Sequence, residues 1–222
     1  MSSQIKLGYW KIRGLAEPLR MMLHYAEMEF EDVLYECGDA PDFDKSCWFD
    51  IKFDLGLDFP NLPYLFDGDV KLTQSLPILH YLAMKTGLAP KDVTPSRIAY
   101  LDMLDHVCMD FVLLGVRLCY SSPQDFAANK TATVEKAKEF LQQFSSVLSD
   151  KKFFGGDEIT GTDFWIFEAL DRFERIAPGI ITHNNLKKFM DQIMALPTLQ
   201  KYFTSSESSR HFPLNNKMAA FK

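Results

Sequence analysis

The chain has 222 residues, 47% of them hydrophobic and 24% charged, a composition that is typical of a folded globular protein and excludes extensive disorder. The formal net charge is −6, and the lysines and arginines are scattered, which argues against a nucleic-acid partner. No apolar run approaches the roughly 18 residues of a membrane span, so no membrane association is expected. Since no apolar leader precedes the first predicted strand, we expect a cytoplasmic protein.

The first third of the chain predicts a small mixed sheet covered by helices. Alternating apolar residues predict strands at 5–9 and 30–35, and Glu17-Pro18 begins a helix between them. An irregular connection over 38–59 follows. Asp67-Gly68 then stands between two apolar runs and predicts a two-residue hairpin turn, because glycine readily adopts the positive φ of such turns.

The hairpin is flanked by two local signals. Before it, Leu62-Pro63 is a candidate cis peptide bond, since X-Pro bonds are where the cis form is least unfavourable. After it, Ser75 is expected to be the N-cap of a helix that ends near Lys85, and such an N-terminus favours an anion. The order β-α-β and then β-β-α is that of a thioredoxin-like α/β domain, which we assign to residues 1–85.

The remaining chain predicts an all-α domain at 95–222, joined through a Gly- and Pro-containing linker at 86–94. Thr160 and Asp163 have the spacing of a reciprocal cap, and the apolar residues that follow predict a helix through the domain core. The tail from Ser205 is polar and expected to be irregular. The apolar residues that recur at helical spacing are Ile98, Leu101, Leu104, Cys108 and Phe111; Val134, Ala137, Leu141, Phe144 and Leu148; and Leu186, Phe189, Met190 and Ile193.

The loop after the first strand is where a thioredoxin-like domain carries its redox cysteines. No cysteine stands there, so disulfide exchange is excluded, and the four cysteines and five histidines lack metal-ligand spacing, so no metal is expected. Tyr9 occupies the position instead. Its hydroxyl can donate a hydrogen bond to a thiolate and thereby lower the pKa of the thiol, although packing at a strand end is the simpler interpretation of Tyr9 alone.

These residues together resemble the cytosolic glutathione transferases, and within them the mu class. The resemblance covers the whole chain; it is strongest over 7–15, 38–44 and 55–75 and looser over 108–110, 118–120 and 160–164. It implies a homodimeric enzyme that conjugates glutathione, as a co-substrate, to small hydrophobic electrophiles, without a cofactor. Two alternatives stay open: a non-catalytic ligand-binding or structural member of the fold, and a glutathione-dependent isomerase of the prostaglandin synthase type.

The resemblance also implies a role for each glutathione-binding residue. Tyr9 would hold the thiolate, with Trp10 beside it, and Leu62 before Pro63 would pair its backbone with the cysteinyl unit. Gln74 and Ser75 would receive the γ-glutamyl carboxylate at a helix N-terminus. The remaining contacts implied are Lys45, Trp48 and Lys52 with the glycyl carboxylate, Asn61 nearby, and Asp110 with the glutathione of the neighbouring subunit. Lys45 replaces the usual arginine, so a forked contact becomes a point charge.

The electrophile pocket implied by the resemblance lies between the two domains. Its lining would comprise Tyr9, Trp10, Ile12, Leu15, Val116 and Tyr120, with the tail over 212–214 as a lid. Tyr120 would donate a proton to some substrates, whereas ordinary core packing is the alternative for Leu15 and Val116. Phe59 resembles an aromatic key that inserts into the partner subunit at the dimer interface, and burial within its own domain is the alternative.

Overall fold

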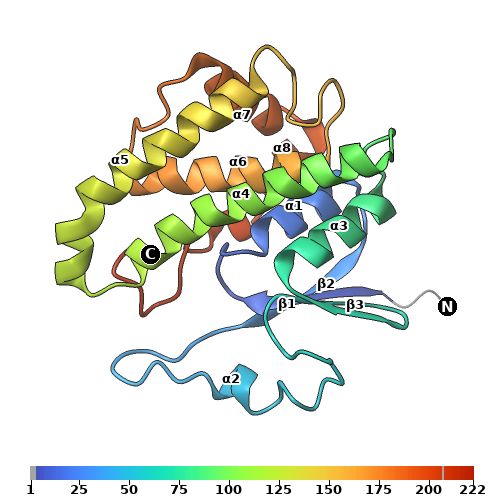
Figure 1. Ribbon diagram of the computed structural model, residues 1–222. Helices are drawn as coiled ribbons and strands as arrows, with labels where there is room; N and C mark the ends of the chain where they lie inside the picture. Colours follow the sequence, from blue (N-terminus) through green and yellow to red (C-terminus); the bar gives the residue numbers. More distant parts are fainter. Residues whose placement is uncertain (1–3, 207) are drawn as a thin grey trace.

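The computed structural model describes residues 4–206 and 208–222, which form a thioredoxin-like α/β region and a helical region (Figure 1). The sheet has the strand order β2-β1-β3-β4. Central strand β1 (Ile5–Trp10) pairs in parallel with β2 (Phe30–Tyr35) and antiparallel with β3 (Tyr64–Asp67), and β4 (Val70–Thr73) forms the edge beside β3. The predicted mixed sheet is therefore confirmed.

The hairpin turn lies one residue later than predicted. Asp67 pairs with Val70, so the turn residues are Gly68 and Asp69, and Gly68 takes the positive φ of +62°. Asp67 stays in the strand because its carboxylate accepts hydrogen bonds from Lys85 and from the Tyr81 hydroxyl on the following helix. The Leu62-Pro63 bond is cis, as predicted, and Ala40-Pro41 is a second cis bond that was not expected.

Helices α1 (Glu17–Tyr25) and α3 (Ser75–Thr86) lie on the side of the sheet that faces the helical region, and α2 (Ser46–Phe49) lies on the opposite side (Figure 1). The connection over 38–59 is thus not wholly irregular. The cap of α3 also differs from the prediction, since Gln74 is the N-cap and Ser75 is the first helical residue. The physical reason is the positive φ of +72° at Gln74, which turns the chain sharply between β4 and α3.

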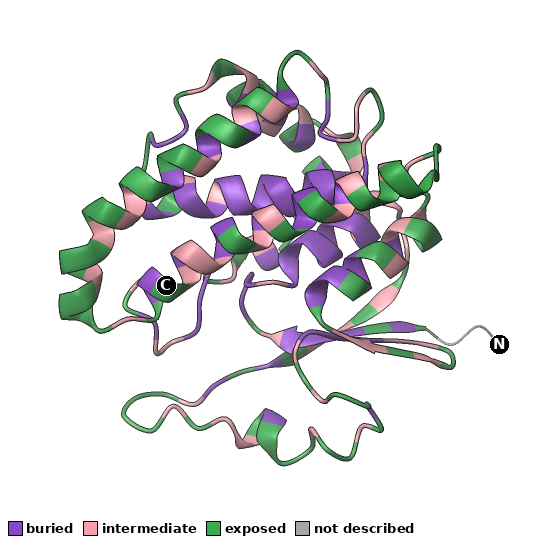
Figure 2. Cartoon of the chain, in the orientation of Figure 1, coloured by how far each residue is buried: buried purple, intermediate pink, exposed green. Residues whose placement is uncertain are grey.

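The helical region is built around α6 (Gly161–Ile176), which is buried along nearly its whole length (Figure 2). Helix α4 (Pro95–Cys119) packs against α6, and α5 (Pro123–Leu148) packs against α4. Both follow the predicted apolar spacing, except that Ile98 is 51% exposed. The other helices are α7 (Asn184–Met194), α8 (Pro197–Thr204) and the short 3-10 helix η1 (Ser209–His211) in the tail. Within the described ranges, no helix combines the length and the apolar character of a membrane span.

The predicted reciprocal cap of α6 is confirmed. The Asp163 carboxylate accepts hydrogen bonds from the backbone N–H of Thr160 at 2.8 Å and of Phe154 at 2.7 Å. Asp163 is fully buried, and burial raises its pKa to about 6 despite these donors. Because the native pKa lies above the unfolded value, the free energy of unfolding should fall as pH rises from about 4 to 6.

Asp163→Asn is expected to lower the free energy of unfolding by about 1–3 kcal/mol, because an amide oxygen satisfies one donor while the NH₂ group faces the other. The difference from wild type should be larger near pH 5 than near pH 7, since only the carboxyl gains stability on protonation. Urea unfolding of both proteins, with the exposed Asp150→Asn as control, measures this. Equal stability of Asp163→Asn and wild type at both pH values would contradict it.

Candidate functional site

A cavity of about 450 Å³ opens where the end of β1, the C-terminal part of α4 and the chain's tail meet. All the residues that were predicted to line the electrophile pocket surround this cavity, namely Tyr9, Trp10, Ile12, Leu15, Val116 and Tyr120. Lys45, from the segment before α2, also lines it. The lining is mostly apolar with a few polar groups, which is the usual composition of a small-molecule site.

Tyr9 is one of the polar residues that line this cavity and is only 7% exposed. Its hydroxyl oxygen accepts a hydrogen bond from the backbone N–H of Leu15 at 3.1 Å, which leaves the O–H proton available for a group in the cavity. Burial raises the pKa of Tyr9, while Arg172 and Arg20 act in the opposite direction. The side chain is therefore a protonated hydrogen-bond donor at neutral pH.

Gly14 shapes the loop that presents Leu15 to Tyr9. It has a positive φ of +49°, and a Cβ atom at this position would lie 2.5 Å from the Tyr9 ring. Only glycine fits such a backbone so close to an aromatic ring. The loop is also fastened to the tail, because the N–H groups of Arg13 and Gly14 donate to the carbonyls of Pro213 and Leu214 at 2.9 and 3.2 Å.

Arg172 is a residue of the site that the sequence reasoning missed. It lies on α6, is 1% exposed and lines the cavity. Its guanidinium donates to the Gly14 carbonyl at 2.9 Å and to the Asn215 side-chain oxygen at 3.2 Å, so it joins the loop to the tail. The available signal was an arginine in a helix that is apolar on most sides, since a buried guanidinium needs partners.

The tail contributes different residues from those expected. Asn215, Asn216 and Met218 line the cavity, whereas Phe212 and Leu214 do not. The backbone bonds of residues 213 and 214 to the β1–α1 loop hold that segment outside and direct the next residues inward. The N–H of Asn216 then donates to the Tyr120 hydroxyl at 2.8 Å.

Tyr120 faces the cavity from the C-terminal end of α4. Burial raises its pKa, with the Asn216 N–H opposing this shift, so the hydroxyl is protonated at neutral pH. Like Tyr9, it accepts one backbone hydrogen bond and has a proton left to donate.

The residues predicted to hold the glycyl carboxylate cluster around α2. Lys45 lines the Tyr9 cavity, and the Lys52 ammonium lies 5.3 Å from the ring centroid of Phe49, which lines the same cavity. Trp48 is buried, and its ring stacks on that of Tyr64 with 6.1 Å between centroids. One of the two cations, Lys45, therefore lines the cavity, and the other, Lys52, lies beside a lining residue.

The other predicted residues lie outside the cavity. Leu62 packs with the Tyr9 cluster, and the exposed Asn61 accepts a hydrogen bond from the Leu62 N–H at 2.9 Å. Ser75 is buried and Gln74 exposed at the start of α3. Phe59 is 79% exposed, so its alternative interpretation, burial within its own domain, is wrong.

Asp110 is exposed on α4. Throughout residues 4–206 and 208–222, no group of three or more His, Cys, Asp and Glu side chains is placed to hold a metal ion.

The fold and the site define a class of protein in which a thioredoxin-like domain carries a tyrosine in place of the redox cysteines, beside an apolar cavity completed by a helical domain. The family model for the glutathione S-transferase N-terminal domain matches residues 5–84, and the model for the C-terminal domain matches residues 109–206.

The chain is 40% identical to human Glutathione S-transferase Mu 3 over 98% of its length and 95% of the relative's. It is 43% identical to Glutathione S-transferase Mu 1 of Oryctolagus cuniculus over 92% of both chains. The crystal structure of the glutathione S-transferase Blo t 8 superposes with a TM-score of 0.87 at 31% identity, covering 97% of this chain and 99% of the other. The chain belongs to the glutathione S-transferase family, and these curated relatives are of its mu class.

Proposed function

We propose that this chain adds the thiolate of glutathione to small hydrophobic electrophiles, with Tyr9 as the hydrogen-bond donor that stabilises the sulfur anion. The observation that carries the proposal is the Tyr9 hydroxyl, which is buried, protonated and anchored by the Leu15 N–H at an apolar cavity. The thiol proton leaves to solvent, sulfur forms the new bond to carbon, and the leaving group departs with its electron pair. Glutathione is a co-substrate, and the step needs no cofactor.

The tripeptide would extend from the cavity towards the sheet. Lys45 and Lys52 provide positive charge for the glycyl carboxylate. Trp48, which stands between them in the sequence, would contact the same carboxylate. The Leu62 backbone is next to the Tyr9 cluster and would pair with the cysteinyl unit, with Asn61 adjacent. Gln74 and Ser75 stand at the N-terminus of α3, where free N–H groups and the helix dipole favour the γ-glutamyl carboxylate.

We further propose that two copies form the working unit. Asp110 is exposed on α4 and would contact the glutathione of the partner. Each copy would comprise domains at 1–85 and 95–222 with a linker at 86–94. The exposed Phe59 is the candidate key residue of this interface. Residence in the cytoplasm is a prediction from the sequence alone.

Phe59→Ala is expected to weaken dimerisation by about 30-fold or more, because a central aromatic anchor at an interface commonly contributes at least 2 kcal/mol. Analytical ultracentrifugation over a concentration series measures the dissociation constant. Phe53→Ala is a matched control, since Phe53 is also exposed, at 76%, in the same connection. Equal effects of the two substitutions would refute the special role of Phe59.

One experiment tests the proposed activity. The protein is mixed with glutathione at neutral pH, the thiolate absorbance is recorded, and 1-chloro-2,4-dinitrobenzene is added while the product is identified by mass spectrometry. Thiolate formation followed by the dinitrophenyl conjugate supports the proposal. Absence of both would favour a non-catalytic carrier, and turnover of an endoperoxide without conjugation would favour the isomerase.

A further inference from the structure

Arg172 is a buried cation that lines the Tyr9 cavity and contacts only neutral acceptors. Its guanidinium donates to the Gly14 carbonyl and to the side-chain oxygen of Asn215, and its side chain is 1% exposed. In the part of the chain that the structure describes, its Nε atom has no hydrogen-bond partner. A cation in such a place is unfavourable unless negative charge comes close to it.

The other buried arginines of the described chain do have carboxylate partners. The ion pairs are those of Arg13 with Glu168 and Asp171, both at 2.5 Å, and of Arg20 with Asp32 at 2.8 Å. Arg172 forms no ion pair with any described aspartate or glutamate, although it lies on the same helix as two of these carboxylates. Its charge is therefore left uncompensated at the cavity.

The titratable groups of the neighbouring elements do not supply the missing negative charge. Lys45 lines the same cavity and is itself a cation, and the described lining contains no aspartate or glutamate. The thiols of Cys108 and Cys119 on α4 interact electrostatically with Arg172, but burial raises the pKa of both, so they are neutral at neutral pH. The Tyr120 hydroxyl is neutral for the same reason.

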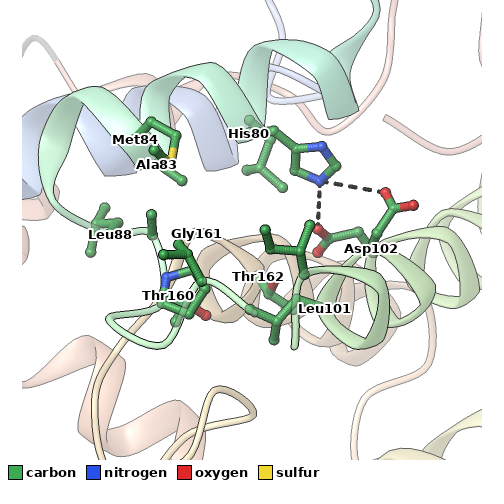
Figure 3. A pocket seen from close by; sticks show the side chains of 15 residues that line it. His80, Ala83, Met84, Leu88, Leu101, Asp102, Thr160, Gly161 and Thr162 are labelled. Atoms are coloured by element: carbon green, nitrogen blue, oxygen red, sulfur yellow. Dashed lines mark hydrogen bonds and ion pairs between the residues drawn. The ribbon is translucent and has the colours of Figure 1, made fainter. Parts of the chain in front are cut away.

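The charges of a second cavity are arranged differently. This cavity, of about 400 Å³, lies between α3, the start of α4 and the start of α6, and it shares no lining residue with the Tyr9 cavity (Figure 3). Its carboxylates face an imidazole, because His80 Nε2 lies 2.9 Å from Asp105 Oδ2 and 3.8 Å from Asp102 Oδ1 (Figure 3). Arg172 has no comparable neighbour among the described residues.

One peptide unit connects Arg172 to Tyr9. The carbonyl of the Gly14-Leu15 peptide accepts a hydrogen bond from Arg172 Nη2 at 2.9 Å, and the N–H of the same peptide donates to the Tyr9 hydroxyl at 3.1 Å. Hydrogen bonds in such a chain polarise one another, and a charged donor at its start strengthens the bonds that follow. Burial raises the pKa of Tyr9, and both the Leu15 N–H and Arg172 oppose this rise.

We propose that Arg172 is a positioning residue that strengthens the hydrogen bond from Tyr9 to the glutathione thiolate through the Gly14-Leu15 peptide. This inference rests on the proposed function. The guanidinium polarises the peptide, the Leu15 N–H becomes a stronger donor to Tyr9, and the Tyr9 O–H becomes a stronger donor to the sulfur. The thiolate in turn brings negative charge to the cavity in which the buried cation lacks a partner.

The test compares a neutral replacement, Arg172→Gln, with a charged one, Arg172→Lys, by recording the thiolate absorbance of bound glutathione against pH. Arg172→Gln should raise the pKa of the bound thiol by about 0.5–1 and lower kcat/KM for 1-chloro-2,4-dinitrobenzene about 3- to 10-fold, because the charge assistance is lost. The KM for glutathione should stay within about twofold. Arg172→Lys should restore most of the thiol pKa. The exposed Arg117→Gln removes the same charge from the surface of α4 and should change neither value.

A double substitution separates the path through the peptide from direct attraction across the cavity. In Tyr9→Phe the chain is already interrupted, so adding Arg172→Gln should change the thiol pKa by less than about half as much as it does in wild type. An equal change in both backgrounds would show that Arg172 acts directly on the sulfur and would overturn the proposal. Equal effects of Arg172→Gln and Arg172→Lys would also overturn it, because shape and not charge would then be responsible.

Thermal melts establish that each variant is folded. If Arg172→Gln is not folded, Arg172→Lys still decides, since a thiol pKa as high as that in Tyr9→Phe would contradict a role for the charge. Absence of a bound thiolate in wild type would overturn the proposed function and this inference together. A normal thiolate in wild type with an unchanged pKa in Arg172→Gln would overturn this inference alone.

Discussion

Tyr9→Phe is expected to lower kcat/KM for 1-chloro-2,4-dinitrobenzene by about 10- to 100-fold, because a hydrogen bond to a charged group contributes about 1.5–3 kcal/mol. The phenylalanine keeps the ring against Gly14 and removes the hydroxyl, both its O–H donor and the oxygen that accepts from the Leu15 N–H. The loss should appear in the reactivity of the thiol and not in its binding, since the proposed contacts of the tripeptide at Lys45 and Ser75 are retained.

The diagnostic measurement is the pKa of glutathione bound to each protein, from thiolate absorbance against pH. With Phe at position 9, this pKa should return by about 1–2 units towards the value of a free thiol, roughly 8.5. Tyr100→Phe is a suitable control, since Tyr100 is half-buried on α4 and lines neither of the two cavities. If Tyr9→Phe leaves both the thiol pKa and conjugation unchanged, another group activates the sulfur and the proposed mechanism is wrong.

The site was predictable where it is built from local sequence and not where it depends on distant contacts. The predicted lining of the electrophile pocket does surround one cavity, because Tyr9 to Leu15 form a single strand-loop segment and Val116 and Tyr120 lie one helical turn apart. Arg172 was missed because its partner Gly14 is 158 positions away, and no helical pattern reveals such a bond.

The same distinction holds for the fold. The alternating strands and the cap at Asp163 were predictable because period and spacing encode them. The start of α3 was placed one residue off, since the positive φ of Gln74 has no signature in that residue type. Ile98 lies on the apolar stripe of α4 yet is exposed, because periodicity gives the face of a helix but not what covers it.

A buried ionic network fixes the β1–α1 loop against the helical region. The Arg13 guanidinium, which is 0% exposed, lies 2.5 Å from the carboxylates of both Glu168 and Asp171 on α6. Arg210 from the tail lies 3.2 and 3.3 Å from the same two carboxylates. Although burial acts to raise it, Arg13 and Arg210 hold the pKa of Asp171 well below its usual range. The network therefore joins the loop that anchors Tyr9 to the core helix and the tail.

Arg13→Met is expected to lower the free energy of unfolding at neutral pH by about 3–5 kcal/mol, because removing one partner leaves buried carboxylates without full compensation. Because the native pKa of Asp171 is depressed, the ionised Asp171 carboxylate stabilises the folded state fully above about pH 4. This stabilisation is lost progressively as the pH falls below about 4. The variant should therefore lose less stability than wild type on acidification from about pH 5 to pH 3.

Denaturant unfolding at several pH values measures both effects, with the exposed Arg117→Met as the matched control. Arg13→Lys separates charge from shape, because lysine keeps the positive charge but loses the planar guanidinium whose Nη2 atom contacts both carboxylates, and it should recover only part of the loss. If Arg13→Met is as stable as wild type, a neighbour such as Arg210 compensates both carboxylates and Arg13 does not fasten the loop. If stability falls but the slope against pH is unchanged, the loss arises from packing and not from the charge on Asp171.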